Sequence, residues 1–275
     1  MAEISVLMGA YNESKEKTSQ AIDSILSQSF TDFEFIIWDD GSDKNYYEWL
    51  ERYCRKDARI RLFRNETNKG LAAVLNQCLA HSSGIYIARM DADDRSEPAR
   101  FEKQYHFLEK HPEYAMAGCS VRMFGNKGTW GIRRLKQKPE KTDFLQTSPF
   151  VHPSIMIRRT VMEELGGYVQ EKWTRRTEDY ELFMRLYAAG YSGYNLPDIL
   201  LCYREDLTSY KRRKYQYRLN ECIVRYRGFL SLGILKNNYR FVVKPLAAGL
   251  IPAFAMWHIK RRRYAVPSGK KKRQE

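Results

Sequence analysis

The feature of the sequence that most constrains its fold is a regular alternation between short apolar runs and segments whose apolar residues recur at helical spacing. The apolar runs predict strands near residues 4–8, 33–38, 59–63, 85–90 and 114–119. Helices are predicted between them near residues 21–26, 50–54, 71–79 and 101–108. Because parallel strands need crossover connections, this alternation predicts an α/β fold with a mainly parallel sheet flanked by helices on both faces.

Polar clusters follow three of the predicted strands directly. They are Tyr11–Glu13, Asp39–Ser42 and Asp91–Asp94. Ligands of an open parallel sheet bind beyond the carboxyl ends of its strands, so we expect these clusters to meet in one acidic crevice. Each cluster alone is also typical of a turn or a helix cap. Together they concentrate carboxylates, which repel each other unless a cation lies among them.

The sharpest single signal is the acidic turn Asp91-Ala92-Asp93-Asp94, which follows an apolar run. Spaced carboxylates in such a turn provide the oxygen ligands that Mg²⁺ and Mn²⁺ accept, and phosphate oxygens usually complete the coordination shell. The chain has no GxxxxGK[ST] loop and no GxGxxG motif. We therefore expect a diphosphate to be held through the metal and not by a glycine-rich loop.

Five motifs occur in order along the chain: Val6–Glu13, Ile37–Ser42, Asn68–Gly70, Arg89–Asp94 and Thr177–Tyr180. In this combination the sequence resembles the family 2 glycosyltransferases with the GT-A fold, in particular bacterial enzymes that build exopolysaccharide, capsule or lipopolysaccharide units. The resemblance covers about residues 3–205. It implies a Rossmann-like, mixed sheet and transfer of a sugar from a nucleotide-diphosphate donor, first of all a UDP-sugar.

The resemblance also implies a role for each matching position. The donor-binding residues would be Ala10, Tyr11 and Glu13 around the nucleoside, Asp39 at the uracil, Asp40 near the ribose, Lys69 near the phosphates, and Asp91 and Ala92 at the ribose or sugar. Asp93, together with Asp91, would ligate the Mn²⁺ or Mg²⁺ cofactor.

Asp179 matches the carboxylate that acts as general base in a single in-line displacement with inversion at the anomeric carbon. A positioned carboxylate that accepts the proton of a sugar hydroxyl contributes roughly 10²–10⁴-fold to the rate. Taken alone, Thr177-Glu178-Asp179 is more typical of a capped helix N-terminus, and the acidic clusters upstream are what favour catalysis. The sequence lacks the QxxRW motif of processive synthases, so we expect transfer of one sugar.

The acceptor side carries weaker signals. His152, Arg175, Arg176 and Glu178 lie near the donor motifs or the base, and contact with the acceptor or with its phosphates is one interpretation. A structural histidine and a solvated loop are the alternatives. Residues 126–141 are rich in glycine and lysine and predict a mobile loop over the site.

Charge divides the chain unevenly. Residues 201–275 hold 19 Lys and Arg against 4 Asp and Glu, a net of +15 in a chain whose total is +14. The uncharged run 245–259 contains Trp257 and precedes Lys260–Arg263, but it is shorter than the roughly 20 residues of a spanning helix. With the basic clusters Lys211–Lys214 and Lys270–Arg273, it predicts a helical tail that lies on an anionic membrane. The alternatives are a helix packed on the catalytic domain and a tilted or re-entrant insertion.

These patterns divide the chain into three parts. Residues 1–120 are interpreted as the nucleotide-sugar-binding half of a GT-A domain, residues 121–205 as the acceptor-binding half with the base, and residues 206–275 as the membrane-interfacial tail. We expect a saccharide acceptor, lipid-linked, and a peripheral or monotopic location at the cytoplasmic face of the inner membrane. The five cysteines have irregular spacing and no CxxC, which argues against a disulfide framework or a thiolate zinc site.

Two other classes of protein compete with a glycosyltransferase. A sugar-nucleotide nucleotidyltransferase usually has a glycine-rich loop after its first strand, where this chain has Ala10–Glu13. A nucleic-acid-binding protein would use the basic tail, but phosphate backbones would avoid the acidic crevice. Nucleic acid is therefore not an expected partner.

Overall fold

The computed structural model describes residues 2–207 and 215–265. Its strands are β1 (Ile4–Ala10), β2 (Phe33–Asp39), β3 (Ile60–Arg64), β4 (Tyr86–Asp91), β5 (Arg95–Ser96), β6 (Met116–Gly125), β7 (Gly128–Arg133), β8 (Met156–Arg158) and β9 (Gly193–Arg204). Its α-helices are α1 (Lys15–Leu26), α2 (Lys44–Cys54), α3 (Leu71–Ala80), α4 (Arg100–Lys110), α5 (Arg159–Glu164), α6 (Glu178–Ala188), α8 (Gln216–Ser231), α9 (Tyr239–Gly249) and α10 (Ala253–Tyr264). Two short 3-10 helices are η1 (Lys141–Leu145) and η2 (His152–Ser154). Each strand and helix predicted before residue 120 is present.

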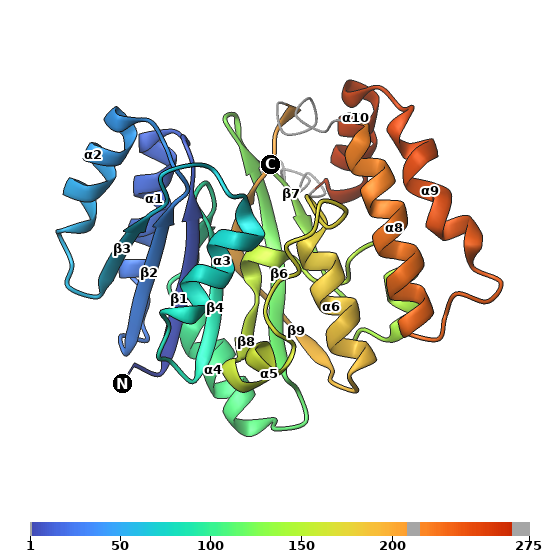
Figure 1. The fold of residues 1–275 in the computed structure, drawn as a ribbon, viewed down its shortest axis with the longest axis horizontal. Helices are drawn as coiled ribbons and strands as arrows, with labels where there is room; N and C mark the ends of the chain where they lie inside the picture. The colour runs from blue at the N-terminus through green and yellow to red at the C-terminus, as the bar shows by residue number, and fades with distance from the viewer. Residues whose placement is uncertain (1, 208–214, 266–275) are drawn as a thin grey trace, which may run out of the picture.

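The strands form one mixed sheet in the order β3-β2-β1-β4-β8-β6-β9-β5, with β7 paired to β6 (Figure 1). β1 lies parallel between β2 and β4, and the register places Ala10 beside Asp39 and Gly9 beside Asp91. The three polar clusters therefore begin at the same edge of the sheet. The predicted α/β class is confirmed, while the meeting of all three clusters in one crevice stays a prediction.

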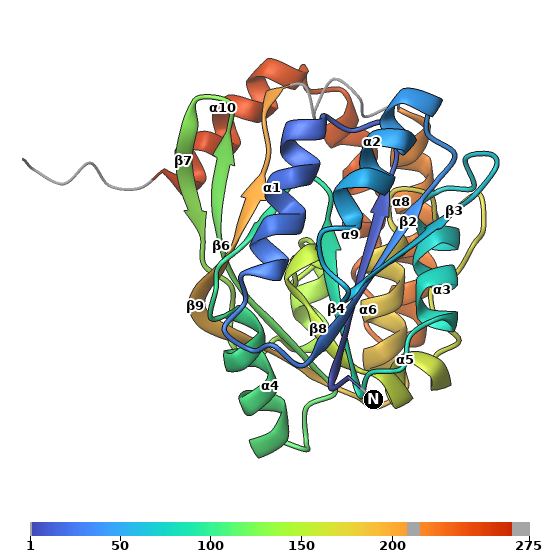
Figure 2. The same ribbon diagram turned by 90° about the vertical axis from the view of Figure 1, so that its left-hand side faces the viewer.

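Helices cover both faces of the sheet, because successive side chains of a strand point to opposite sides. On β1, Val6 and Met8 pack into a core shared with α1, α2 and α4. Leu7 packs into a second core shared with α3, α6 and α8. Figures 1 and 2 show these two helical layers on either side of the strands. The near-continuous apolar runs of the sequence follow from this burial on both faces.

The prediction of a mobile loop over residues 126–141 is wrong for part of that segment. Residues Gly128–Arg133 form β7, which pairs antiparallel with β6 through a tight turn with a positive φ of 91° at Gly128. Trp130 attaches β7 to the rest of the protein. Its ring packs against that of Trp257, and its Nε1 donates a hydrogen bond to Glu205 O at 3.0 Å. A strand that pairs with one neighbour needs few apolar residues, so the low apolar content of residues 126–141 did not exclude a strand there.

The C-terminal part is helical, as predicted. α8 packs against α6, and α9 packs against α8. α10 lies along β7 (Figure 2), where Lys260 Nζ is 2.7 Å from Glu205 Oε2 and the rings of Trp130 and Trp257 meet edge to face at 4.8 Å. The predicted basic clusters at 211–214 and 270–273 lie outside the described residues.

The apolar run 245–259 is not one helix. α9 ends at Gly249, α10 begins at Ala253, and the two helices are bent by 119°. The break contains Pro252, which lacks a backbone N–H and disfavours helical backbone at the residue before it. Within residues 2–207 and 215–265, no single helix is long and apolar enough to cross a membrane, although α9 and α10 together pass that test as one bent pair.

Gln104 offers a test of the packing between α4 and the sheet. Its Nε2 is fully buried and donates to Ala117 O at 2.8 Å and to Ser154 O at 2.7 Å. A buried carbonyl that loses its donor costs about 1–3 kcal/mol, so Gln104→Leu should lower the free energy of unfolding by about 2–4 kcal/mol in urea titrations. The control Gln20→Leu, on the outer part of α1, should change it by less than about 0.5 kcal/mol. A loss below about 1 kcal/mol for Gln104→Leu would contradict this account.

Candidate active site

The acidic turn lies where β4 ends and the chain enters the short strand β5. Carboxylate oxygens of Asp91, Asp93 and Asp94, one from each residue, all lie within 4.8 Å of one another. Arg204, at the end of β9, holds this turn: its backbone N donates to Asp94 Oδ1 at 2.6 Å, and its Nε donates to Asp93 O at 2.9 Å. Because β5 pairs with β9 at the same place, the end of β9 fixes the shape of the turn.

Burial and the repulsion between neighbouring carboxylates raise the pKa values of Asp93 and Asp94. Burial, followed by the charges of Asp91 and Glu13, raises the pKa of Asp93 to about 7. Burial, followed by the charges of Asp93 and Asp91, raises the pKa of Asp94 well above its usual range. Within the described residues, the buried Asp94 Oδ2 has no hydrogen-bond partner. A compact group of hard oxygen ligands with such unbalanced charge fits Mg²⁺ or Mn²⁺.

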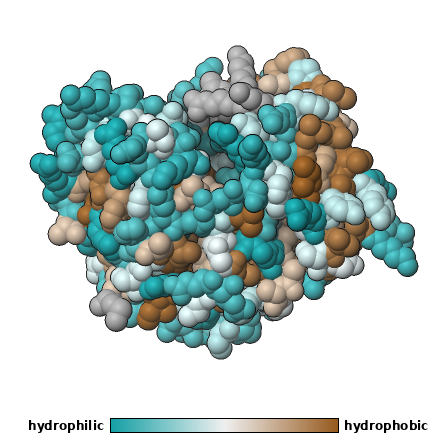
Figure 3. Space-filling model, viewed as in Figure 1, coloured by the Kyte–Doolittle hydropathy of each residue, from teal (hydrophilic) through white to brown (hydrophobic). Residues whose placement is uncertain are grey.

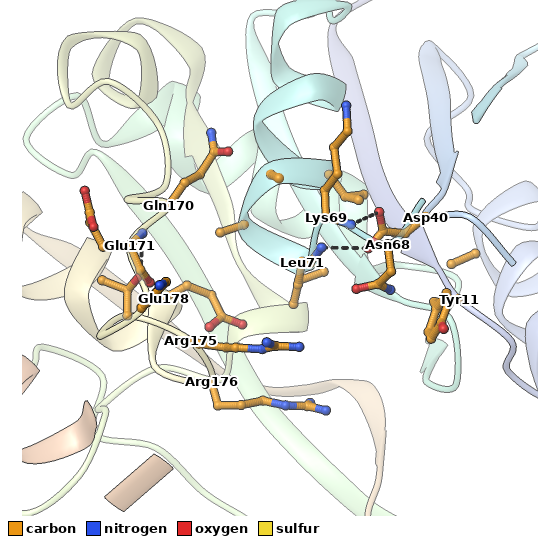
Figure 4. A pocket seen from close by; sticks show the side chains of 18 residues that line it. Tyr11, Asp40, Asn68, Lys69, Leu71, Gln170, Glu171, Arg175, Arg176 and Glu178 are labelled. Atoms are coloured by element: carbon orange, nitrogen blue, oxygen red, sulfur yellow. Dashed lines mark hydrogen bonds between the residues drawn. The ribbon is translucent and has the colours of Figure 1, made fainter. Parts of the chain in front are cut away.

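A cavity of about 490 Å³ opens at the end of β1. One wall consists of residues 68–74, which lead into α3, and the other consists of residues 170–176, which lead toward α6. The cavity brings together six residues predicted from the sequence: Ala10, Tyr11, Asp40, Lys69, Arg175 and Arg176, with Glu178 as a seventh. Segments about 100 residues apart in the chain thus face each other across one space (Figure 4).

Asp40 organises the first wall of the cavity. Its Oδ1 accepts hydrogen bonds from Asn65 Nδ2 at 2.9 Å and from Lys69 N at 2.8 Å, and its Oδ2 accepts one from Gly70 N at 2.8 Å. These bonds fix the loop in front of α3, so that the first turn of this helix lines the cavity. The ribose contact of Asp40 stays a prediction, and this structural role is additional to it.

Asp39 is completely buried at the end of β2. Its Oδ2 accepts a hydrogen bond from Ser42 N at 3.2 Å and lies 3.3 Å from Arg64 Nε, whereas its Oδ1 has no partner within the described part of the chain. Burial raises the pKa of this carboxyl. A free acceptor here fits the N–H of a nucleobase, but the predicted uracil contact requires a neighbouring group to move, because Asp39 has no exposed surface.

The other donor-binding candidates lie along the cavity and the acidic turn. Ala10 is buried and Tyr11 is 52% exposed, and both line the cavity. Glu13 Oε1 lies 3.0 Å from Lys17 Nζ. The charge of Glu13 raises the pKa of Asp93, and that of Lys17 lowers it. Ala92 is buried within the turn itself, where a larger side chain would disturb the spacing of the acids.

Four basic residues line the cavity: Lys69, Lys172, Arg175 and Arg176. Figure 4 shows Arg175 and Arg176 reaching from the second wall across the space toward the first. Arg176 has a positive φ of 72°, which a non-glycine residue adopts rarely and at some cost in strain. The amine of Lys69 points along α3, away from the two arginines (Figure 4). The arginines are thus better placed than Lys69 to meet an anionic group inside the cavity.

Asp179 lies in the first turn of α6, next to Glu178, which lines the cavity. Burial raises the pKa of both carboxyls, that of Glu178 to about 7. Asp91 also raises the pKa of Asp179, and Arg89 lowers it, so both groups lie within electrostatic reach of Asp179. Thr177 precedes the helix, but its hydroxyl donates to a backbone carbonyl of the preceding turn and does not cap α6.

His152 has a structural environment. It is buried in η2, and its Nε2 lies 2.7 Å from the hydroxyl of Tyr168. Burial, with a smaller effect of Arg89, lowers its pKa well below the usual range, so the ring is neutral. The acceptor contact of His152 stays a prediction, and the geometry favours the structural alternative.

Two residues of the site were not singled out from the sequence. Arg204 acts mainly through its backbone N–H and Nε, and no local pattern marks such a contact. Arg89 lies two residues before Asp91, and its Nη1 is 2.5 Å from Asp91 Oδ1. Side chains two residues apart on a strand lie on the same face of the sheet. The spacing in Arg89-Met90-Asp91 could therefore have predicted this ion pair.

Comparison with solved structures gives the class of protein. The chain superposes on S. aureus TarS 1-349 in complex with UDP-GlcNAc with a TM-score of 0.67, 17% identity, and coverage of 90% of this chain and 72% of that one. It superposes on mannosyltransferase PcManGT from Pyrobaculum calidifontis, in complex with GDP-Man and Mn²⁺, with a TM-score of 0.63, 18% identity, and coverage of 95% and 80%. The chain has the GT-A fold of glycosyltransferases.

Sequence comparison narrows the class to one family. The family model for glycosyl transferase family 2 matches residues 5–166. EpsE of Bacillus subtilis is 40% identical over 261 residues, which cover 94% of each chain. The amylovoran biosynthesis glycosyltransferase AmsE of Erwinia amylovora is 29% identical, covering 92% of this chain and 96% of that one. The Escherichia coli UDP-Gal:alpha-D-GlcNAc-diphosphoundecaprenol beta-1,3-galactosyltransferase is 30% identical, covering 81% and 82%. The chain belongs to glycosyl transferase family 2.

We expect metal binding to compete with protonation of the acidic turn. Because the pKa of Asp93 is raised to about 7, this carboxyl is mostly protonated below neutral pH and must release its proton when a metal binds. The affinity for Mn²⁺ without nucleotide should therefore be roughly tenfold higher at pH 8 than at pH 6, as measured by calorimetry. Asp93→Asn removes a metal ligand and should weaken Mn²⁺ binding at both pH values, while the remote Asp57→Asn should keep both the affinity and its pH dependence. An affinity independent of pH would contradict the assignment.

Proposed function

We propose that this glycosyltransferase is a metal-dependent, inverting enzyme that transfers a single sugar from a UDP-sugar to a saccharide acceptor in bacterial cell-surface polysaccharide synthesis. The observation that carries the proposal is the group of Asp91, Asp93 and Asp94 carboxylates within 4.8 Å of one another, at the same edge of the sheet as a cavity that Glu178, the neighbour of Asp179, helps to line. The names of the amylovoran and galactosyltransferase relatives and the nucleotide sugars in the two similar structures support it. Family membership argues against the nucleotidyltransferase alternative, and the acidic crevice argues against nucleic-acid binding.

The chemistry follows from the placement of the carboxylates. Bound to Asp93 and Asp91, Mn²⁺ or Mg²⁺ would neutralise negative charge on the leaving diphosphate. Asp179 accepts the proton of the acceptor hydroxyl while the hydroxyl oxygen forms its bond to the anomeric carbon. The bond from that carbon to the diphosphate oxygen breaks on the opposite side, so the configuration inverts. Arg175 and Arg176 present positive charge to the phosphates of the donor or of a lipid-linked acceptor.

Replacement of the base gives a direct test of this function. Asp179→Asn should lower kcat at least about 10²-fold and change the affinity for UDP less than about threefold, because an amide keeps the shape of the side chain but cannot take up the proton. The donor is found first by thermal-shift screening of nucleotide sugars with Mn²⁺, and kcat is then measured as release of the nucleotide diphosphate. Glu178→Gln is the matched control and should keep most of the activity. An active Asn variant beside an inactive Gln variant would make Glu178 the base.

We further propose that the acceptor is lipid-linked and that the enzyme works at the cytoplasmic face of the plasma membrane, with its C-terminal helices on the membrane. Of the 13 large apolar side chains that are exposed within the described residues, 11 lie between residues 215 and 259. On α8 they are Leu219, Ile223, Tyr226 and Leu230, whose spacing forms one stripe along the helix. Tyr239, Val243 and Leu250 form a matching stripe on and just beyond α9.

The two stripes form one surface, since α8 and α9 pack side by side. Figure 3 shows apolar residues gathered at the right-hand side of the molecule, where Figure 1 places α8 and α9. Leu250, Ile251 and Phe254 extend the surface around the bend into α10 and are 76%, 40% and 62% exposed. In Figure 1 this bend lies at the end of the molecule toward which the parallel strands run, the end that holds the acidic turn.

Charge favours an anionic leaflet as the partner of this apolar surface. The apolar surface is bordered by basic residues, among them Arg227, Arg240 and the run Arg261–Arg263. Each basic residue close to an anionic leaflet contributes about 1 kcal/mol, and inserted apolar side chains add to this through burial. Such an orientation would present a lipid-linked acceptor to the same end of the molecule as the acidic turn.

Vesicle binding tests the membrane proposal. The triple variant Leu230→Gln, Leu250→Gln and Phe254→Gln should bind vesicles of phosphatidylglycerol and phosphatidylcholine at least about tenfold more weakly in sedimentation assays, because its apolar insertion is lost. The control Ile85→Gln removes an equally exposed apolar residue (57%) from the start of β4 and should bind like the unmodified protein. Pure phosphatidylcholine should bind weakly in all cases. Loss of self-association without loss of vesicle binding would instead identify the surface as an interface between copies of the chain.

A further inference from the structure

The end of β9 lies between the acidic turn and the C-terminal helix α10. Arg204 is the last residue of this strand, and its backbone N donates to Asp94 Oδ1 at 2.6 Å while its Nε donates to Asp93 O at 2.9 Å. Glu205 follows directly, and Lys260 Nζ of α10 lies 2.7 Å from both of its carboxylate oxygens. The end of β9 therefore touches the acidic turn on one side and α10 on the other.

The ion pair between Lys260 and Glu205 is buried on its acidic side. Glu205 is 2% exposed, whereas the ion pair of Lys103 with Asp198, elsewhere on β9, has side chains that are 45% and 39% exposed. A buried carboxylate whose cation is removed tends to move toward water, because burial of an unpaired charge is costly. An exposed pair contributes little. Loss of Lys260 should therefore displace the end of β9, and loss of Lys103 should not.

Backbone contacts keep Glu205 and α10 in this arrangement. Glu205 N donates to Phe124 O at 2.8 Å, and Glu205 O accepts from Trp130 Nε1 at 3.0 Å, so both β6 and β7 hold this residue. α10 lies so close to β7 that a Cβ atom at Gly131 would be 2.6 Å from Tyr264 O (Figure 2). Glycine permits this close approach of two backbones. A side chain at residue 131 would therefore push the end of α10 away from β7 without changing any charge.

We propose that Lys260 is a positioning residue for the metal site. By pairing with Glu205 it holds the end of β9, and Arg204 thereby holds the acidic turn at the spacing of carboxylates that a divalent cation requires. The proposal rests on the proposed function in one respect, since it takes Asp93 and Asp91 as ligands of Mn²⁺ or Mg²⁺. The affinity for the metal should therefore depend on the packing of α10 against β7.

The sign of the effect separates this role from simple electrostatics. Lys260 is a cation on the side of a proposed cation site, so removal of its charge alone would raise the affinity for Mn²⁺. Loss of positioning lowers the affinity instead. A contact that served stability alone would lower the unfolding temperature when broken and leave the affinity of the folded protein unchanged.

The experiment is calorimetric titration of the full chain with Mn²⁺ at pH 8, with Lys260→Met and Gly131→Ala beside the unmodified protein. Changes in the groups that orient metal ligands typically lower metal affinity about 10–100-fold, and we expect each variant to bind at least about fivefold more weakly while it remains folded by circular dichroism. Lys260→Arg keeps the charge and should recover at least part of the lost affinity. Lys103→Met, the matched control, breaks the exposed ion pair on β9 and should bind within about twofold of the unmodified protein.

A double-mutant cycle tests the route through Glu205. Lys260→Met combined with Glu205→Gln should bind Mn²⁺ within about twofold of Glu205→Gln alone, because Lys260 acts through that carboxylate. Losses that multiply would overturn the proposal, as would an unchanged or higher affinity of Lys260→Met. Should Lys260→Met not fold, Gly131→Ala decides alone, and an unchanged affinity of that variant overturns the proposal. If Asp93→Asn binds Mn²⁺ as tightly as the unmodified protein, the metal site of the proposed function is wrong, which is a failure separate from that of Lys260.

Discussion

The common register of β1, β2 and β4 is the constraint on which the rest of the site depends. Asp39 lies beside Ala10 and Asp91 beside Gly9, and this register is fixed because each strand has both faces buried and cannot slide. A slip by one residue would move Val6 into the wrong core and shift an acid by about 3.3 Å. Packing of apolar side chains in the two cores therefore fixes the positions of the carboxylates at the sheet edge.

This placement has an electrostatic consequence. The charges of Asp91 and Glu13 raise the pKa of Asp93, those of Asp93 and Asp91 raise the pKa of Asp94, and cations from different elements offset these effects in part. Lys17 approaches from α1, Arg204 from β9, and Arg89 from within β4. The remaining negative charge favours a divalent ion, so the repulsion between these carboxylates would add to the affinity for a metal.

The sequence predicted the first 120 residues well because buried parallel strands and amphipathic helices have strong apolar patterns. It predicted the acidic turn for the same reason, since an acid directly after such a strand must lie at the sheet edge. β7 was missed because one packed residue, Trp130, does not make a pattern. The structural role of Asp40 and the burial of Arg89 could not be predicted, since both depend on contacts between segments far apart in the chain.

The packing of α10 against β7 connects the C-terminal helices to the acidic turn through few residues. Lys260 pairs with Glu205, and the neighbouring Arg204 bonds Asp93 and Asp94. The rings of Trp257 on α10 and Trp130 on β7 pack edge to face next to this ion pair. Mechanical load on α10, whether from a bound surface or from an attached tag, would thus pass through two adjacent residues, Glu205 and Arg204, to the acidic turn. A chain shortened before residue 245 would lose this contact, so its acidic turn would be less rigid than that of the full chain.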